Sequence, residues 1–131
     1  MCSTWSGDTT NQTLSGSSDV TITVADGTGA TNDSLTVTSA TCTFRFGSLN
    51  LGSNAYVSGG NATFGGSGNN KSTIAWTAAS RTLTITLGGP VGTLGTVNSS
   101  TPVYTASGSI TDTPGGTISN SPFTLAAAKQ F

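Results

Sequence analysis

Strict alternation of polar and aliphatic residues is the feature that most constrains the fold of this chain. In residues 80–89, SRTLTITLGG, three threonines alternate with three aliphatic residues: Thr82, Thr84 and Thr86 with Leu83, Ile85 and Leu87. A period of two is typical of an antiparallel strand with one face on a core and the other in water. Threonine suits the wet face because a strand restricts its β-branched side chain little further. We therefore expect buried aliphatic residues and solvated hydroxyls in this strand.

Other short alternating runs recur along the chain, and Gly, Asn, Asp or Pro residues bound them. They are DVTITVADG, SLTVTSA, TCTFRFG, STIAWTA, PVYTAS, GSITD and SPFTLAAA. This pattern of strands and turns is typical of a β-sandwich or barrel, and no run has the apolar stripe of a helix. A length of 131 residues fits one domain. The sequence thus predicts a single all-β domain with antiparallel sheets.

The composition excludes several classes of partner. Charged residues make up only 7% of the chain, and four Lys and Arg residues cannot form a basic patch. We therefore expect no nucleic-acid partner. No apolar run is long enough to cross a bilayer, so we expect no membrane-spanning segment. The regular aliphatic alternation predicts a folded chain with a neutral surface.

The two cysteines, Cys2 and Cys42, leave two interpretations open. The chain has no histidine, which excludes a Cys/His zinc site. The cysteines form either a disulfide between the amino terminus and a central strand or two unpaired thiols. A Ser/Thr-rich β-protein of low charge is typical of exported proteins, which favours the disulfide and an extracellular location. Five Asn-X-Ser/Thr triplets fit an extracellular surface as well: Asn11, Asn32, Asn61, Asn70 and Asn98.

The order of landmarks in residues 74–125 resembles a known family. IAWTAASRTLTITL is followed by Tyr104, the segment Ser109-Ile110-Thr111-Asp112, a glycine pair at 115 and 116, and Phe123. These features resemble the bacterial Ig-like domains of surface-layer proteins and large cell-surface adhesins, in which Asn usually stands at the place of Gly116. The resemblance implies an antiparallel Ig-like β-sandwich over residues 18–131. It also implies a structural or adhesive role at the cell surface without catalysis.

Acidic and amide residues in the turns form a candidate calcium site. Calcium takes six to eight oxygen ligands, and turn carboxylates can supply several of them. The alternative is that these side chains accept hydrogen bonds within their own turns. No pair of convergent carboxylates and no Ser-His-Asp set can be formed, so we expect no enzyme and no cofactor other than calcium. The candidate calcium ligands are Asp26, Asn32, Asp33 and Asp112.

Three functions remain open. The first is a structural or adhesive module of an exported prokaryotic cell-surface protein, whose partners are neighbouring domains or subunits of that protein. The second is a filament or pilus subunit in which residues 1–17, a flexible or strand-donating segment, complete the sheet of a neighbour. The third is a carbohydrate- or ice-binding module, with threonine ranks facing ice or aromatic residues contacting a glycan. The candidate aromatic residues are Trp5, Tyr56, Trp76 and Tyr104.

Overall fold

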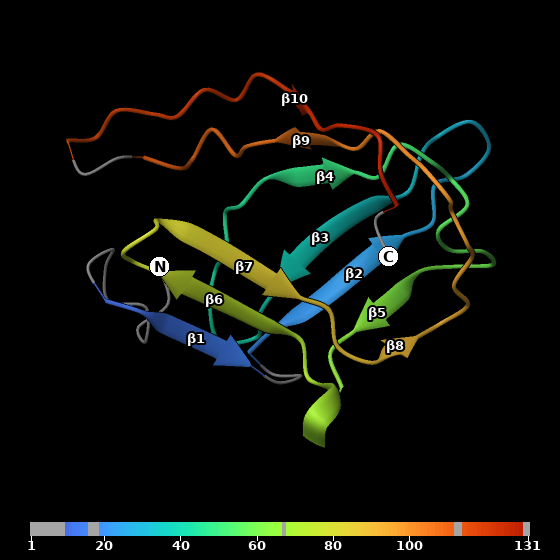
Figure 1. The fold of residues 1–131 in the computed structure, drawn as a ribbon, viewed down its shortest axis with the longest axis horizontal. Coiled ribbons are helices and arrows are strands. Elements are labelled where there is room, and N and C mark those ends of the chain that lie inside the picture. Colours follow the sequence, from blue (N-terminus) through green and yellow to red (C-terminus); the bar gives the residue numbers. More distant parts are fainter. Residues whose placement is uncertain (1–9, 16–18, 67, 112–113, 130–131) are drawn as a thin grey trace. The chain divides into compact units, whose positions relative to one another are not determined.

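The chain folds into β-strands and the loops that join them. The computed structural model describes residues 10–15, 19–66, 68–111 and 114–129. Within these ranges the strands form two antiparallel sheets, one of three strands and one of seven (Figure 1). The only helix in the described part is a three-residue 3₁₀ turn, η1 (Gly68–Asn70), and no helix there is long and apolar enough to cross a membrane. The prediction of an all-β protein with antiparallel sheets is confirmed.

The three-stranded sheet has the order β1-β6-β7. Its strands are β1 (Gln12–Ser15), β6 (Thr73–Thr77) and β7 (Thr82–Thr86). The central strand, β6, aligns its Ile74 with Leu14 on one side and with Ile85 on the other. The short turn between β6 and β7 ends at Arg81, whose φ of 53° lies in the left-handed region that favours glycine.

The seven-stranded sheet has the order β10-β9-β4-β3-β2-β5-β8. β2 and β3 coincide with alternating runs of the sequence, and β8 begins with a proline, which an outermost strand tolerates. The bounds are β2 (Thr21–Ala25), β3 (Ser34–Thr38), β4 (Ser48–Asn50), β5 (Ala62–Phe64), β8 (Pro90–Val91), β9 (Val103–Thr105) and β10 (Phe123–Thr124).

The contacts within the chain define two compact units, each with buried side chains of its own. The first comprises Met1–Thr23, Val37–Phe44 and Thr63–Val91, and the second comprises Val24–Thr36, Arg45–Ala62 and Gly92–Phe131. Buried residues of the first unit are Val20, Ile22, Cys42, Phe64, Ser72 and Ile74. Buried residues of the second unit include Val24, Asp33, Leu51, Tyr56, Val57, Ala62, Val97, Ser100 and Ala106.

The alternation correctly identifies the buried face of one strand. Val20, Ile22 and Val24 are all 0% exposed, as expected for DVTITVADG. The expectation of a strand over TCTFRFG is wrong, because β4 begins only at Ser48. Burial still alternates along residues 41–47. Alternating burial indicates an extended backbone, whereas a β-strand also requires hydrogen bonds to a neighbouring strand.

In β7 the threonine side chains have the exposure that the sequence predicts, whereas the aliphatic side chains do not. The three threonines of this strand are exposed, as expected. Ile85, however, is 37% exposed, and Leu83 and Leu87 are half-buried. The expected full burial is therefore wrong. The physical reason is that β7 is an outermost strand, and an outermost strand is covered from fewer sides than a central one.

Candidate functional site

The carboxylate of Asp33 is buried and accepts hydrogen bonds through both of its oxygens. Asp33 directly precedes β3 and is 0% exposed. Its Oδ1 accepts a hydrogen bond from the amide of Gly27 at 2.8 Å. Its Oδ2 accepts hydrogen bonds from the amides of Tyr56 at 2.8 Å and Val57 at 3.1 Å. We call this carboxylate and its three amide donors the Asp33 clamp.

The Asp33 clamp connects two loops that are far apart in the sequence. Gly27 lies between β2 and β3, whereas Tyr56 and Val57 lie between β4 and β5. The backbone of Asp33 adds two further bonds to the second loop. Its amide donates to the carbonyl of Ser53 at 2.8 Å, and its carbonyl accepts from the amide of Leu51 at 2.9 Å. Because a buried carboxylate is tolerated only where hydrogen bonds replace its lost hydration, these donors explain its place in the core.

The other predicted calcium ligands also make hydrogen bonds. Oδ2 of Asp26 accepts from the amide of Gly60 at 2.8 Å, and Nδ2 of Asn32 donates to Oδ1 of Asn50 at 3.1 Å. Asp112 lies outside the described residues. Among the described residues, no three Asp, Glu, His or Cys side chains gather in a group that could hold a metal ion. Asp26 and Asp33 thus accept hydrogen bonds from a distant loop, and the expectation that such side chains bond only within their own turns does not describe them. Calcium binding stays a prediction.

A second buried polar contact joins Tyr56 to Ser100. The hydroxyl groups of these two residues lie 2.6 Å apart, and both side chains are buried. Ser100 also pairs with Ala128 through two backbone hydrogen bonds, at 3.1 and 3.0 Å. The segment near the carboxyl end is thereby attached to the second unit in an extended conformation.

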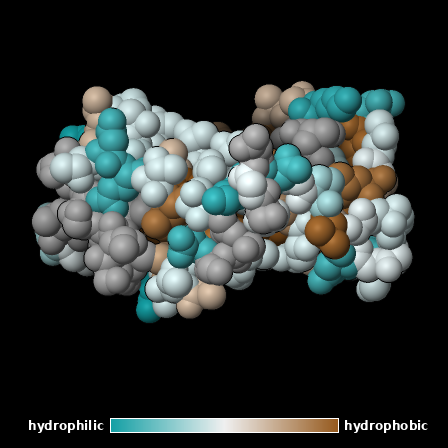
Figure 2. Space-filling model, turned by 90° about the horizontal axis from the view of Figure 1, so that it is seen from below, coloured by the Kyte–Doolittle hydropathy of each residue, from teal (hydrophilic) through white to brown (hydrophobic). Residues whose placement is uncertain are grey.

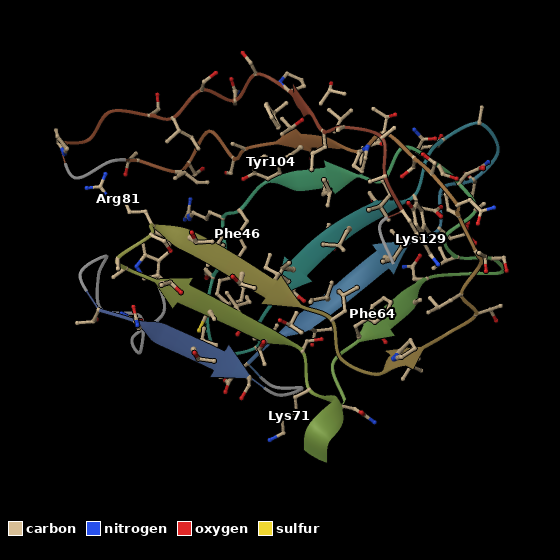
Figure 3. All side chains as sticks on the ribbon, in the orientation of Figure 1. Phe46, Phe64, Lys71, Arg81, Tyr104 and Lys129 are labelled. Carbon is tan, nitrogen blue, oxygen red and sulfur yellow. The ribbon has the colours of Figure 1, made fainter. Side chains whose placement is uncertain are left out.

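The aromatic residues proposed as a glycan platform occupy different environments. Tyr56 is 0% exposed, so it cannot stack on a sugar at the surface. Trp76 is half-buried on the same face of β6 as Ile74. Tyr104 is half-buried and donates its hydroxyl proton to the carbonyl of Phe46 (Figure 3). Trp5 lies outside the described residues. Glycan contact therefore stays a prediction.

One face of the three-stranded sheet consists mostly of small hydroxyl side chains, with Ala75 on its central strand. The register places Thr73 opposite Thr86, Ala75 opposite Thr84 and Thr77 opposite Thr82. Neighbouring strands lie about 4.8 Å apart, so these side chains form regular rows. β1 adds a third row on the other side of β6. The threonine face, as we call it, consists of Thr13, Ser15, Thr73, Ala75, Thr77, Thr82, Thr84 and Thr86.

No member of the threonine face carries a charge. The sequence pattern of β7 indicates one row, but it gives no sign that β1 and β6 add two more. In the view of Figure 2, residues of intermediate hydropathy cover most of the coloured surface, and strongly hydrophobic residues form separate patches. A hydroxyl face of this kind is fully accounted for by solvation, and ice binding stays a prediction.

Cys42 lies in the first unit and is 8% exposed. Its Sγ lies 3.5 Å from Oγ1 of Thr41, which in turn donates a hydrogen bond to Oδ1 of Asp19 at 2.8 Å. Cys2 lies outside the described residues, so the Cys2–Cys42 disulfide stays a prediction. The five asparagines of the Asn-X-Ser/Thr triplets are all exposed, as an extracellular surface allows.

Comparison with protein-family models, with curated proteins and with solved structures finds no match for this chain.

Proposed function

We propose that this chain is a non-enzymatic structural or adhesive module, with an Ig-like β-sandwich fold, of an exported prokaryotic cell-surface protein. The Asp33 clamp is the observation that carries this proposal. A fully buried acid in an enzyme serves chemistry only if an oxygen can reach a reacting group. In this chain both oxygens of Asp33 bind backbone amides of two loops. The carboxylate therefore holds loops in place, which is a structural task.

Other buried polar side chains also join separate segments of the chain through hydrogen bonds. Oγ of Ser72 donates to the carbonyl of Phe64 at 2.8 Å and accepts from the amide of Gly88 at 3.0 Å. These two bonds join the end of β5 to the segment after β7. Tyr56 and Ser100 join two loops of the second unit. Every buried side-chain nitrogen or oxygen in the described part has a hydrogen-bond partner. Satisfied buried polar groups favour one rigid loop arrangement, which suits a spacer or a scaffold for adhesion.

The chemistry of the surface supports an extracellular location. The chain is rich in hydroxyl and glycine residues, with only 7% charged residues. The threonine face keeps a sheet soluble without charge. The resemblance over residues 74–125 to the Ig-like domains of surface-layer proteins and adhesins points to the same location. The predicted Cys2–Cys42 disulfide would be stable there.

Antibody labelling of the source organism tests this proposal. An antibody raised against the folded chain is applied to intact cells and, in parallel, to permeabilised cells. We expect comparable labelling in both, because the epitopes lie outside the cell envelope. A cytosolic protein probed in the same cells is the control and should be labelled only after permeabilisation. Labelling of this chain only after permeabilisation would overturn the proposal.

A further inference from the structure

We propose that Asp26 is a site of spontaneous isomerisation to isoaspartate, and that the Asp33 clamp slows this reaction in the folded chain. Asp26 and Gly27 form the only Asp-Gly pair in the sequence, and the sequence contains no Asn-Gly pair. The inference goes beyond the structural role proposed above, because it assigns a covalent modification site and the contact that controls it. The reaction needs no enzyme and no co-reactant other than water.

The reaction joins the side chain of Asp26 to the backbone of the next residue. The backbone nitrogen of Gly27 attacks the side-chain carboxyl carbon of Asp26, and the amide proton leaves together with a hydroxyl of the carboxyl group as water. The product is a cyclic succinimide. Water then opens the ring at the backbone carbonyl carbon, so that the main chain continues through the former side chain. Glycine favours ring closure because it has no Cβ and its backbone is conformationally free.

The fold requires glycine at position 27, because other backbone atoms approach it closely. A Cβ built on Gly27 would lie 2.1 Å from the carbonyl oxygen of Thr31 and 2.6 Å from the carbonyl carbon and oxygen of Asn32. These distances are far below van der Waals contact, so any other residue forces the loop to move. The chain therefore cannot remove its susceptible Asp-Gly pair by replacing the glycine.

The Asp33 clamp holds the nucleophile of this reaction. The amide of Gly27 donates to Oδ1 of Asp33 at 2.8 Å, and Asp33 is 0% exposed. The nitrogen of a succinimide carries no proton and can no longer donate. Ring closure therefore deprives a buried carboxylate oxygen of this donor, and the lost bond is of the stronger, charge-assisted kind. The clamp thus raises the barrier to isomerisation.

Hydrogen bonds to a second segment restrain the electrophile. Oδ2 of Asp26 accepts from the amide of Gly60 at 2.8 Å, and the amide of Asp26 donates to Oδ1 of Asn61 at 3.0 Å. These partners lie just before β5, so the carboxyl group and the backbone of Asp26 are attached to the same distant segment. Both bonds limit the rotation that brings the carboxyl carbon to the Gly27 nitrogen. They are exposed, so we expect them to restrain less than the buried clamp does.

Peptide mapping of stored protein tests the role of the clamp. Wild-type, Asp33→Asn and Ile74→Ala chains are stored folded at the same mildly acidic pH. Their proteolytic peptides are then analysed by liquid chromatography and electron-transfer mass spectrometry, which distinguishes isoaspartate from aspartate at equal mass. We expect isoaspartate at position 26 to form on the order of 10-fold faster in Asp33→Asn than in wild type, because the Gly27 amide has lost its charged acceptor.

The Ile74→Ala chain controls for a general loss of stability. Ile74 is fully buried in β6 of the first unit, whereas the Asp33 clamp lies in the second unit. We expect its isoaspartate to form at the wild-type rate, since rare unfolding contributes little while nearly all molecules are folded. Equal rates in wild type and Asp33→Asn would overturn the proposal. A slower rate in Asp33→Asn, or equal acceleration in Ile74→Ala, would overturn it as well.

A comparison without substitutions covers the case in which Asp33→Asn does not fold. The wild-type chain is stored folded in buffer and unfolded in urea at the same pH. We expect isoaspartate at position 26 to form on the order of 100-fold faster in the unfolded chain, because unfolding releases both the Gly27 amide and the Asp26 carboxyl group from their hydrogen bonds. Equal rates would overturn the protection. Isoaspartate in the unfolded chain at other positions but not at Asp26 would overturn the assignment of the site.

Discussion

Replacement of Asp33 by asparagine is the sharpest test of the structural role given to the buried carboxylate. The substitution conserves shape and removes one acceptor oxygen. The remaining oxygen of asparagine can accept from the amides of Tyr56 and Val57, which share one carboxylate oxygen in the native chain. The new NH₂ group then faces the amide of Gly27, which is itself a donor. The Gly27 amide is left without an acceptor.

The expected loss of stability follows from these three bonds. One donor without an acceptor costs about 1–3 kcal/mol. The two bonds that remain change from a carboxylate acceptor to a neutral one, and each weakens by about 1 kcal/mol. We therefore expect Asp33→Asn to lower the free energy of unfolding by about 4 kcal/mol. For a chain of this size, such a loss lowers Tm by roughly 10–15 °C.

Equilibrium unfolding in urea, followed by tryptophan fluorescence and by circular dichroism, measures this loss. Asp26→Asn is the matched control, since Asp26 is partly exposed and its side chain accepts a hydrogen bond from the amide of Gly60. We expect the control to lose about 1 kcal/mol or less. Equal losses for the two variants, or a loss below about 1 kcal/mol for Asp33→Asn, would refute the assignment of Asp33 as a clamp.

Three further substitutions test local features of the fold by the same unfolding measurement. Arg81→Gly should stabilise the chain by about 0.5–1 kcal/mol, because glycine relieves the left-handed backbone, whereas Arg81→Ala keeps the strain and should bring no such gain. Ser72→Ala should destabilise by about 1–3 kcal/mol, because the amide of Gly88 loses its acceptor; an unchanged urea midpoint would contradict the contact. Ile74→Ala should cost about 2–5 kcal/mol and Thr84→Ala less than about 0.5 kcal/mol; similar costs for both would mean that the two faces of the sheet are misassigned.

The sequence predicts the parts of the fold in which local alternation and burial coincide. β2 is the best case, since its aliphatic residues alternate and Ile22 and Val24 are fully buried. β7 is recognised as a strand, but its position at the edge of a sheet depends on pairing with distant segments. The burial of Ile85 was therefore overestimated. β1 is missed as a paired strand because four residues, QTLS, carry too little periodicity.

The hydrogen bonds of Asp33 also could not be predicted from the local sequence. An Asn-Asp pair in a loop favours either a cation or a local hydrogen-bonded turn. The structure shows a third arrangement for Asp33, because two of its three amide donors lie 23 and 24 residues away. Only the tertiary fold brings the loop after β4 to this carboxylate. The residues around Asp33 in the sequence do not indicate that the amides of Tyr56 and Val57 are its partners.

Mechanical unfolding of single molecules tests the structural function most directly. Tandem copies of the full chain are stretched in reductant between a surface and a force probe, with Asp33→Asn copies measured in parallel. We expect each wild-type copy to resist force and to unfold in one main step that releases on the order of 400 Å of chain, and the Asp33→Asn copies to unfold at lower force. Extension of the wild-type chain without a resolvable unfolding step would contradict its assignment as a rigid structural module.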